Sequence, residues 1–411
     1  MFRRRILSIM LICAMTVAFT GCESSEDAST SVNVDKDVSV STSQATEEVT
    51  TTTEPVPVEN PTVNITVEGD NLIHSSIYNQ ANARANYNGY DFSYAYERVQ
   101  KLFTGDLNIM NQETLICNDE YPPADYPCFN SPVALGDHMI DLGINVFSMA
   151  NNHMLDMGTD GLSACLDYWD SKESQGIIHY GAYRDEADMQ NIATTEVNGI
   201  SFAFVAFTEY TNGLSLPEGS PLQIVYTSEV DRMKSQIELA DQLADVVVVS
   251  VHWGSEDTHE VDDARRTLAQ DFADWGANLI IGTHSHTVQS MEYLTNKYGD
   301  KAFVFYSLGN FISAQSDNFN LVGLVGDLNV TKDLSTNSII IDNVKAKPVI
   351  THYGYSYSDI QVYPYFEYND DLATQHGVHT ANSGNYHDFS MEVIDGILTQ
   401  NVPSEFLYLQ Q

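Results

Sequence analysis

The chain has 411 residues, of which 43% are hydrophobic, and this apolar content is enough for a sizeable folded core. Its 18 lysine and arginine residues stand against 57 aspartate and glutamate residues, which gives a formal net charge of −39. Clustered lysine and arginine hold phosphate backbones and anionic lipid headgroups, so this charge excludes non-specific binding to nucleic acid or to a bare anionic membrane. A polyanionic ligand would need a local cation, either a rare basic cluster or a bound metal ion.

The N-terminus has the pattern of a secretory signal. Three arginines at positions 3–5 precede an apolar run over residues 6–19, which is too short to span a bilayer comfortably. Small residues then lead into Cys22. We predict that residues 1–21 are a lipoprotein signal peptide and that Cys22 is the lipidated first residue of the mature chain. An uncleaved N-terminal anchor is the alternative, and both place the body outside the cytoplasm at the cell membrane.

Residues 22–62 are rich in serine, threonine, valine and glutamate, with three prolines and few aromatic residues. This composition predicts a disordered acidic stalk between the anchor and the folded body. Beyond it the body contains three cysteines. Cys117 and Cys128 are the nearest pair for a disulfide, and Cys165 is left over. Since no CxxC spacing occurs, a thiolate zinc site is not expected.

From residue 63 onward, short apolar runs alternate with segments of helical periodicity. The expected strands are 63–69, 107–111, 144–150, 202–208, 246–252, 279–282 and 303–309. The expected helices are 92–103, 132–142, 161–171, 229–244 and 262–275. This alternation predicts an α/β domain over residues 63–315 with largely parallel, buried strands.

Residues 316–411 differ in character, because the helical alternation stops. Segments 321–331 and 338–342 are expected to pair as strands, and a tyrosine-rich stretch follows them. We interpret this part as a small β-rich C-terminal extension in which the tyrosines form one face of a sheet. His376, His379 and His387 lie in a glycine- and asparagine-rich stretch without ligand spacing, and we expect them on the surface.

The residues with chemical potential follow the predicted strands. In open α/β sheets, ligands bind outside the carboxyl ends of the strands. Five such ends carry carboxylate, amide or imidazole side chains: Asp70 and His74, Glu113, Asn152 and His153, His252 and Glu256, and His284 and His286. Each group alone is also compatible with a turn, a helix cap or a structural hydrogen bond. Their coincidence at five strand ends favours a site for one or two divalent ions, which could polarise a substrate and activate water.

Six motifs carry a family resemblance. They are GDNLIH at 69–74, NQET at 111–114, ANNHMLDMGTDGL at 150–162, HWGSE at 252–256, GTHSHTVQSME at 282–292 and FYSLGNF at 305–311. In their order and spacing the chain resembles the bacterial capsule-synthesis CapA proteins, which are associated with poly-γ-glutamate capsules and are similar to calcineurin-like metallophosphatases. The resemblance implies a four-layer α/β/β/α sandwich. One departure is that Asp70 and His74 stand four residues apart, whereas metallophosphatases usually have these ligands two apart.

The resemblance also implies roles for individual residues. The implied metal ligands are Asp70, His74, Glu113, Asn152, His252, His284 and His286. His153 would act beside the metals as a proton donor or transition-state stabiliser, and Asp70 and Asn152 would join it in the catalytic set. We assign Glu256 and Asn310 to substrate binding. The implied cofactors are one or two divalent ions, with Mn, Zn, Fe and Mg all open.

Three functions fit these expectations. The first is a metal-dependent hydrolase or transferase at the cell surface, acting on poly-γ-glutamate, a similar anionic polymer or a phosphoester. The second is a non-catalytic capsule-assembly or export component that grips polymer carboxylates through the same ions. The third is a binding protein whose degenerate site serves only folding. His153 favours catalysis, because a purely structural site does not need a residue placed for proton transfer. The expected partners are the polymer or its precursors, the membrane through the lipid anchor, and capsule synthesis or export membrane proteins.

Overall fold

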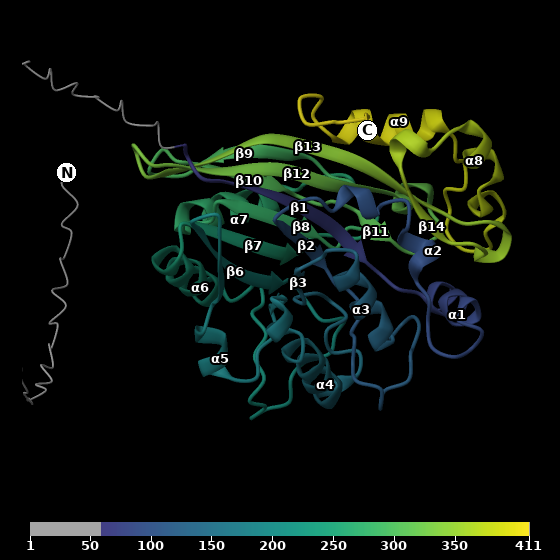
Figure 1. Cartoon of the computed structure of the whole chain (residues 1–411), viewed down its shortest axis with the longest axis horizontal. Coiled ribbons are helices and arrows are strands. Elements are labelled where there is room, and N and C mark those ends of the chain that lie inside the picture. Colours follow the sequence, from purple (N-terminus) through teal and green to yellow (C-terminus); the bar gives the residue numbers. More distant parts are fainter. Residues whose placement is uncertain (1–58, 411) are drawn as a thin grey trace, which may run out of the picture. The chain divides into compact units, whose positions relative to one another are not determined.

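Two β-sheets pack face to face, and helices cover their outer sides (Figure 1). The computed structural model describes residues 59–410, so the predicted signal peptide, Cys22 and most of the predicted stalk lie outside the described residues. Within residues 59–410, no helix is both long and apolar enough to cross a membrane. The α/β/β/α sandwich implied by the resemblance is confirmed.

The first sheet has the strand order β14-β13-β12-β1-β2-β3-β4, with β11 paired beside the end of β1. Its strands are β1 Thr62–Asn71, β2 Leu107–Asn111, β3 Val146–Ser148, β4 Ile178–Tyr180, β11 Asn310–Ile312, β12 Val322–Asp333, β13 Ser338–His352 and β14 Gln361–Pro364. Strands β1 to β4 are parallel, whereas β12 pairs antiparallel with β1. The segment after residue 315 therefore supplies three strands of the same sheet that carries β1.

The second sheet has the order β5-β6-β7-β8-β10-β9. Its strands are β5 Ala193–Val197, β6 Ile200–Thr208, β7 Val246–His252, β8 Leu279–Thr283, β9 Met291–Thr295 and β10 Lys301–Phe305. The four central strands are parallel, and antiparallel partners close the two edges. The seven strands expected from the sequence up to residue 309 are present, with ends that differ by a few residues. The short parallel strands β4 and β11 were not predicted.

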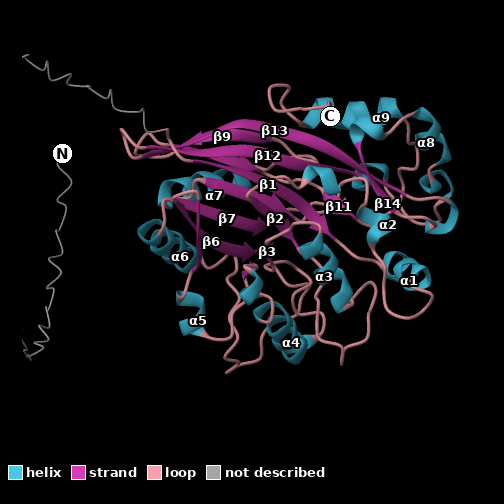
Figure 2. Cartoon of the chain, in the orientation of Figure 1, coloured by secondary structure: helices cyan, strands magenta, loops and turns pink. Residues whose placement is uncertain are grey.

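The helices connect these strands (Figure 2). They are α1 Ser75–Arg84, α2 Ser93–Tyr96, α3 Val133–Asp141, α4 Gly158–Asp170, α5 Glu186–Gln190, α6 Val230–Leu243, α7 Asp263–Trp275, α8 Asp370–Gln375 and α9 Met391–Asn401. The prediction of one helix over 92–103 is wrong, because α2 ends after one turn and a separate 3₁₀ turn follows at Gln100–Leu102. Aromatic and β-branched residues crowd this segment and lower its helix propensity, so burial of its apolar positions decides the local path.

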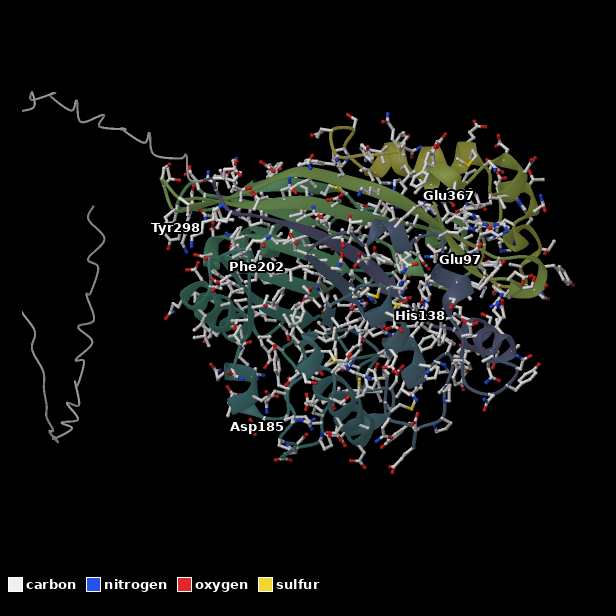
Figure 3. The ribbon with its side chains drawn as sticks, viewed as in Figure 1. Glu97, His138, Asp185, Phe202, Tyr298 and Glu367 are labelled. Carbon is white, nitrogen blue, oxygen red and sulfur yellow. The ribbon has the colours of Figure 1, made fainter. Side chains whose placement is uncertain are left out.

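The alternation of side chains along the strands explains the layers. In β7, Val246 and Val248 face the first sheet, whereas Val247, Val249 and Val251 pack with α6 and α7 on the other side. Successive side chains of a strand point to opposite faces, so a run of valines serves two apolar cores. Phe202 of β6, labelled in Figure 3, is fully buried in the core between the sheets. This packing fixes the strand ends at which the predicted ligands stand.

The interpretation of the C-terminal tyrosines as one face of a sheet is wrong. Tyr363 lies in β14, whereas Tyr355, Tyr357 and Tyr365 lie in 3₁₀ turns.

Two other expectations are wrong. The disulfide between Cys117 and Cys128 is absent: both thiols are free, with Cys117 buried and donating to the Gly161 carbonyl. His376 is not on the surface, because its ring packs between Tyr353 and Phe389. Its Nε2 lies 3.0 Å from the Thr351 carbonyl oxygen, and its Nδ1 accepts a hydrogen bond from the backbone N–H at residue 378.

Candidate metal centre

The carboxyl ends of five parallel strands from both sheets meet at one place in the sandwich. Six of the predicted ligands stand there: Asp70 in β1, Glu113 after β2, Asn152 after β3, His252 at the end of β7, and His284 and His286 after β8. All six side chains are buried. Segments far apart in the sequence are thus brought together by the strand order alone.

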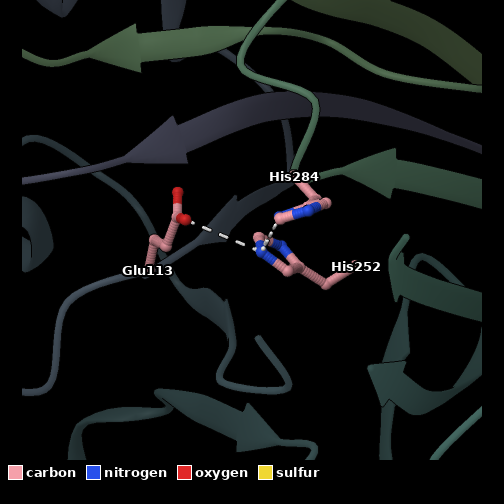
Figure 4. Close-up of side chains that lie close together, drawn as sticks. All are labelled: Glu113, His252 and His284. Atoms are coloured by element: carbon pink, nitrogen blue, oxygen red, sulfur yellow. Dashed lines mark hydrogen bonds and ion pairs between the residues drawn. The ribbon is translucent and has the colours of Figure 1, made fainter. Parts of the chain in front are cut away.

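Glu113, His252 and His284 form a first group of ligand atoms, all within 4.8 Å of one another (Figure 4). His252 Nε2 lies 3.0 Å from His284 Nδ1 and 3.6 Å from Glu113 Oε1. The Asn152 Oδ1 atom lies 3.0 Å from the same nitrogen. Two imidazole nitrogens and two oxygens around one point form a donor set that suits a divalent transition-metal ion.

Asp70, Glu113 and His286 form a second group with the same spacing. His286 Nδ1 lies 3.3 Å from Asp70 Oδ2, and His286 Nε2 lies 3.7 Å from Glu113 Oε1. A third group joins His284 and His286 to Glu256. Because Glu113 belongs to the first two groups, it is the residue that could serve two ions, if both groups bind one.

The electrostatics of these residues fit a bound cation. Both carboxylate oxygens of Glu113 are buried without a hydrogen-bond partner. Burial, followed by the charge of Asp70, raises the pKa of Glu113 well above its usual range. Burial lowers the pKa of His252 and His284, and neighbouring histidines lower it further. Burying a charged group without a partner is costly, and a divalent ion would supply that partner.

The backbone that carries the last two histidines is strained. His284 has φ 97° and His286 has φ 57°, which is the left-handed region that non-glycine residues rarely adopt. The strand before them lies close to its neighbour: a Cβ added at Gly282 would stand 2.0 Å from the Tyr306 carbonyl oxygen. Asp70 Oδ2 accepts a hydrogen bond of 3.2 Å from the His284 backbone N–H. Strain of this kind is typical of ligand-binding and catalytic sites.

Three residues that the sequence analysis did not single out hold the ligands in place. Asn111 donates a 2.7 Å hydrogen bond from Nδ2 to Asp70 Oδ1. The Thr283 hydroxyl lies 3.0 Å from Nδ1 of His252. The Tyr210 hydroxyl contacts His284 Nε2. Asn111 and Thr283 are the last residues of β2 and β8, and Tyr210 follows β6 by two residues. The expectation that ligands bind at the carboxyl ends of the strands therefore points to these three residues as well.

Two predicted residues lie beside the ligand groups. His74 Nδ1 accepts a hydrogen bond of 3.2 Å from the Ala314 backbone N–H, and its ring packs edge-on against Phe129. His74 is in none of the three groups, and its metal role stays a prediction. Asn310 is buried, and its Oδ1 lies 3.0 Å from Nδ1 of His286. It therefore orients a ligand, and its contact with substrate stays a prediction.

A pocket of about 480 Å³ opens beside the first ligand group. Its lining residues are Tyr126, Pro127, Cys128, Asn152, His153, Asp156, Asn212, Leu214 and Glu256. His153 Nδ1 lies 2.7 Å from Asp156 Oδ2, and that oxygen also accepts a hydrogen bond from the Phe129 backbone N–H. This contact orients the His153 ring through Nδ1, so Nε2 is the ring nitrogen that does not face Asp156. The sequence signal for Asp156 was its position three residues after His153 in the same motif.

The comparison with protein families decides the assignment. A family model described as "Bacterial capsule synthesis protein PGA_cap" matches residues 64–315, more than half of the chain. The chain belongs to this family. The matched region runs from β1 to just beyond β11 and contains every strand end described above.

Two relatives carry names consistent with the PGA_cap family. The chain is 31% identical over 176 residues to "PGA biosynthesis protein CapA" of Bacillus subtilis (strain 168), which covers 43% of this chain and 44% of that protein. It is 32% identical over 180 residues to "Capsule biosynthesis protein CapA" of Bacillus anthracis, covering 43% and 41%. The aligned region thus spans less than half the length of these curated relatives.

Two solved structures are loosely similar. One is titled as a novel phosphatase from Mycoplasma pneumoniae, with a TM-score of 0.41 and 14% identity over 71% of this chain and 95% of that chain. The other is titled as a putative 5'-nucleotidase from Staphylococcus aureus, with a TM-score of 0.42 and 12% identity over 73% and 54%.

Proposed function

We propose that this PGA_cap protein acts at the cell surface on an anionic capsule polymer of the poly-γ-glutamate type, and that a divalent-metal centre performs hydrolysis or group transfer on it. The observation that carries the proposal is the His153–Asp156 pair beside the buried groups of Asp70, Glu113, His252, His284 and His286. The names of the two Bacillus relatives support the polymer class.

Each side chain has a distinct part in this proposal. Glu113, His252, His284 and Asn152 would hold one ion, and Asp70, Glu113 and His286 would hold a second. Bound ions would supply Lewis-acid chemistry and lower the pKa of a water molecule. His153 lines the pocket with its Nδ1 fixed on Asp156, so Nε2 gives a proton to the leaving group.

The location follows from the N-terminal sequence. The basic region, the short apolar run and Cys22 support a lipoprotein that is held outside the cytoplasm by a lipid anchor. In that location the pocket would meet the polymer or its precursors, and membrane proteins of capsule synthesis or export would be its neighbours.

The test is an activity panel on the full chain in detergent micelles, with poly-γ-glutamate and generic phosphoesters, with Mn²⁺ or with a chelator. His153→Ala should reduce turnover at least 100-fold while elemental analysis finds the same metal content. His387→Ala, which changes a half-buried histidine that does not line the pocket, is the matched control.

Two outcomes would contradict the catalytic proposal. If the parent shows no metal-dependent turnover, yet binds polymer in a chelator-sensitive manner that survives His153→Ala, the protein grips polymer without catalysis. If it takes up no Mn²⁺ or Zn²⁺ at all, the metal centre itself is refuted.

A further inference from the structure

A second cluster of metal-type ligands lies at the edge of the first sheet, separate from the candidate metal centre. Asp170 ends helix α4, Glu173 lies in the 3₁₀ turn Glu173–Gln175 that follows, and His179 lies in the edge strand β4. One ligand atom from each lies within 4.8 Å of the other two. The cluster shares no residue with the three groups described above.

His179 is the member that points to a ligand. Its side chain is only 10% exposed, and its Nε2 lies 3.0 Å from Asp170 Oδ1 and 3.6 Å from Glu173 Oε1. Neither contact has the alignment of a hydrogen bond, and both ring nitrogens are buried without a hydrogen-bond partner. A buried imidazole with two unsatisfied nitrogens is costly, and it faces two carboxylates at a distance too short to be incidental.

These separations match those between ligands of one ion. Zinc binds imidazole nitrogen at about 2.0–2.1 Å and carboxylate oxygen at about 2.0–2.2 Å, so neighbouring ligand atoms stand about 3.0–3.5 Å apart. Such ligand atoms face the ion rather than one another, which accounts for the short but misaligned contacts.

The carboxylate of Asp170 is already held in place. Arg184 contacts its Oδ2 atom and also pairs with Asp167 Oδ1 at 2.7 Å. The other oxygen, Oδ1, faces His179. A ligating carboxylate whose second oxygen is fixed by a neighbouring donor is the usual arrangement around bound metals. With Asp167, Asp170 and Glu173 against Arg184, the local charge still favours a cation.

We propose that Asp170, Glu173 and His179 bind a divalent transition-metal ion of the zinc type, with water completing the coordination. The ion would join the end of α4 and the turn after it to the edge strand β4. Its role is structural, because the ion would fix these elements to one another at a place apart from the candidate metal centre. This site is independent of the proposed catalytic function.

Zinc content measured on the full chain in detergent micelles tests this site. In a background carrying His284→Ala and His286→Ala, which disables the metal centre, elemental analysis after zinc loading and desalting should find about one ion per chain. Adding His179→Gln should remove that ion and the zinc-dependent rise in Tm. Adding His387→Gln, which changes a half-buried histidine that belongs to no ligand group among the described residues, should remove neither.

The proposal is overturned if the background binds no zinc, or if His179→Gln leaves zinc content and the Tm shift unchanged. If circular dichroism shows that the variant with His284→Ala and His286→Ala is unfolded, His179→Gln and His387→Gln are compared as single substitutions in the parent chain. There, His179→Gln must bind one ion fewer than His387→Gln and retain the metal-dependent activity of the parent. Equal metal content in those two variants would refute the site.

Discussion

Replacing Glu113 by glutamine gives the most direct test of the metal centre. Glu113 is fully buried, both of its oxygens lack a hydrogen-bond partner, and it belongs to two of the three ligand groups. Glutamine has nearly the same volume and no charge. The change should therefore leave the metal-free protein as stable as the parent, or more stable, while it removes the stabilisation that the ions provide.

The size of the metal-dependent rise in Tm follows from mass action. A metal present at 100 times its Kd stabilises the folded state by about 2.7 kcal/mol. With an unfolding entropy of about 2.1 cal/mol/K per residue, about 350 described residues give roughly 0.7 kcal/mol/K, so the metal raises Tm by roughly 4 °C. Glu113→Gln should remove most of that rise. Differential scanning calorimetry with Mn²⁺ and with a chelator measures both states.

Glu68 provides a matched control. It is also fully buried, with both oxygens unpartnered and its pKa raised by burial, but it belongs to no ligand group in the described chain. Glu68→Gln should keep the full metal-dependent rise in Tm. The argument is refuted if Glu113→Gln retains the rise, or if Glu68→Gln loses as much of it.

Three further predictions concern other parts of the chain. Asp156→Asn should lower kcat roughly 10- to 100-fold with metal content unchanged, because His153 loses its orienting carboxylate; steady-state kinetics beside elemental analysis check this. Burial lowers the pKa of His376 to about 3, so its contribution to stability is complete above pH 6.5 and is lost as the pH falls. Between pH 6.5 and 4.5 this loss is roughly 2–3 kcal/mol, and urea unfolding of His376→Gln should show a correspondingly weaker acid dependence. Maleimide should label Cys128 in the native protein and Cys117 only after unfolding, as peptide mapping would show.

The strand-end rule explains how much of the site could be predicted. Glu113 and His252 are far apart in the sequence, yet each stands at the carboxyl end of a parallel strand, one in each sheet, and the structure brings these ends of the two sheets together. What the rule could not give is which side chains at those ends face the ions. His74 lies just after β1, close in sequence to Asp70, but its Nδ1 accepts a hydrogen bond from the Ala314 backbone N–H, a contact between residues 240 positions apart.

The failed predictions for His376 and for the Cys117–Cys128 disulfide share one physical cause, which is tertiary packing. His376 lies in a polar, glycine-rich stretch that predicts a surface loop, whereas the aromatic rings of Tyr353 and Phe389 pack against it and it is buried. Local sequence also suggested a Cys117–Cys128 disulfide by proximity alone. In the structure the first thiol lies in the core and the second on the lip of the pocket, because the chain between them turns outward. Burial of this kind depends on tertiary packing that no short window contains.

The net negative charge of the chain bears on how it would bind an anionic polymer. If residues 1–21 are removed, three arginines go with them and the net charge changes from −39 to −42. The residues that line the described pocket include Glu256 and Asp156 but no lysine or arginine. Arg265, on the helix that follows HWGSE, is already paired with Glu209 and Asp262. A polymer of carboxylates would therefore be repelled by the protein alone, and ions bound by Glu113 and the three histidines would be the cations that bring it to His153.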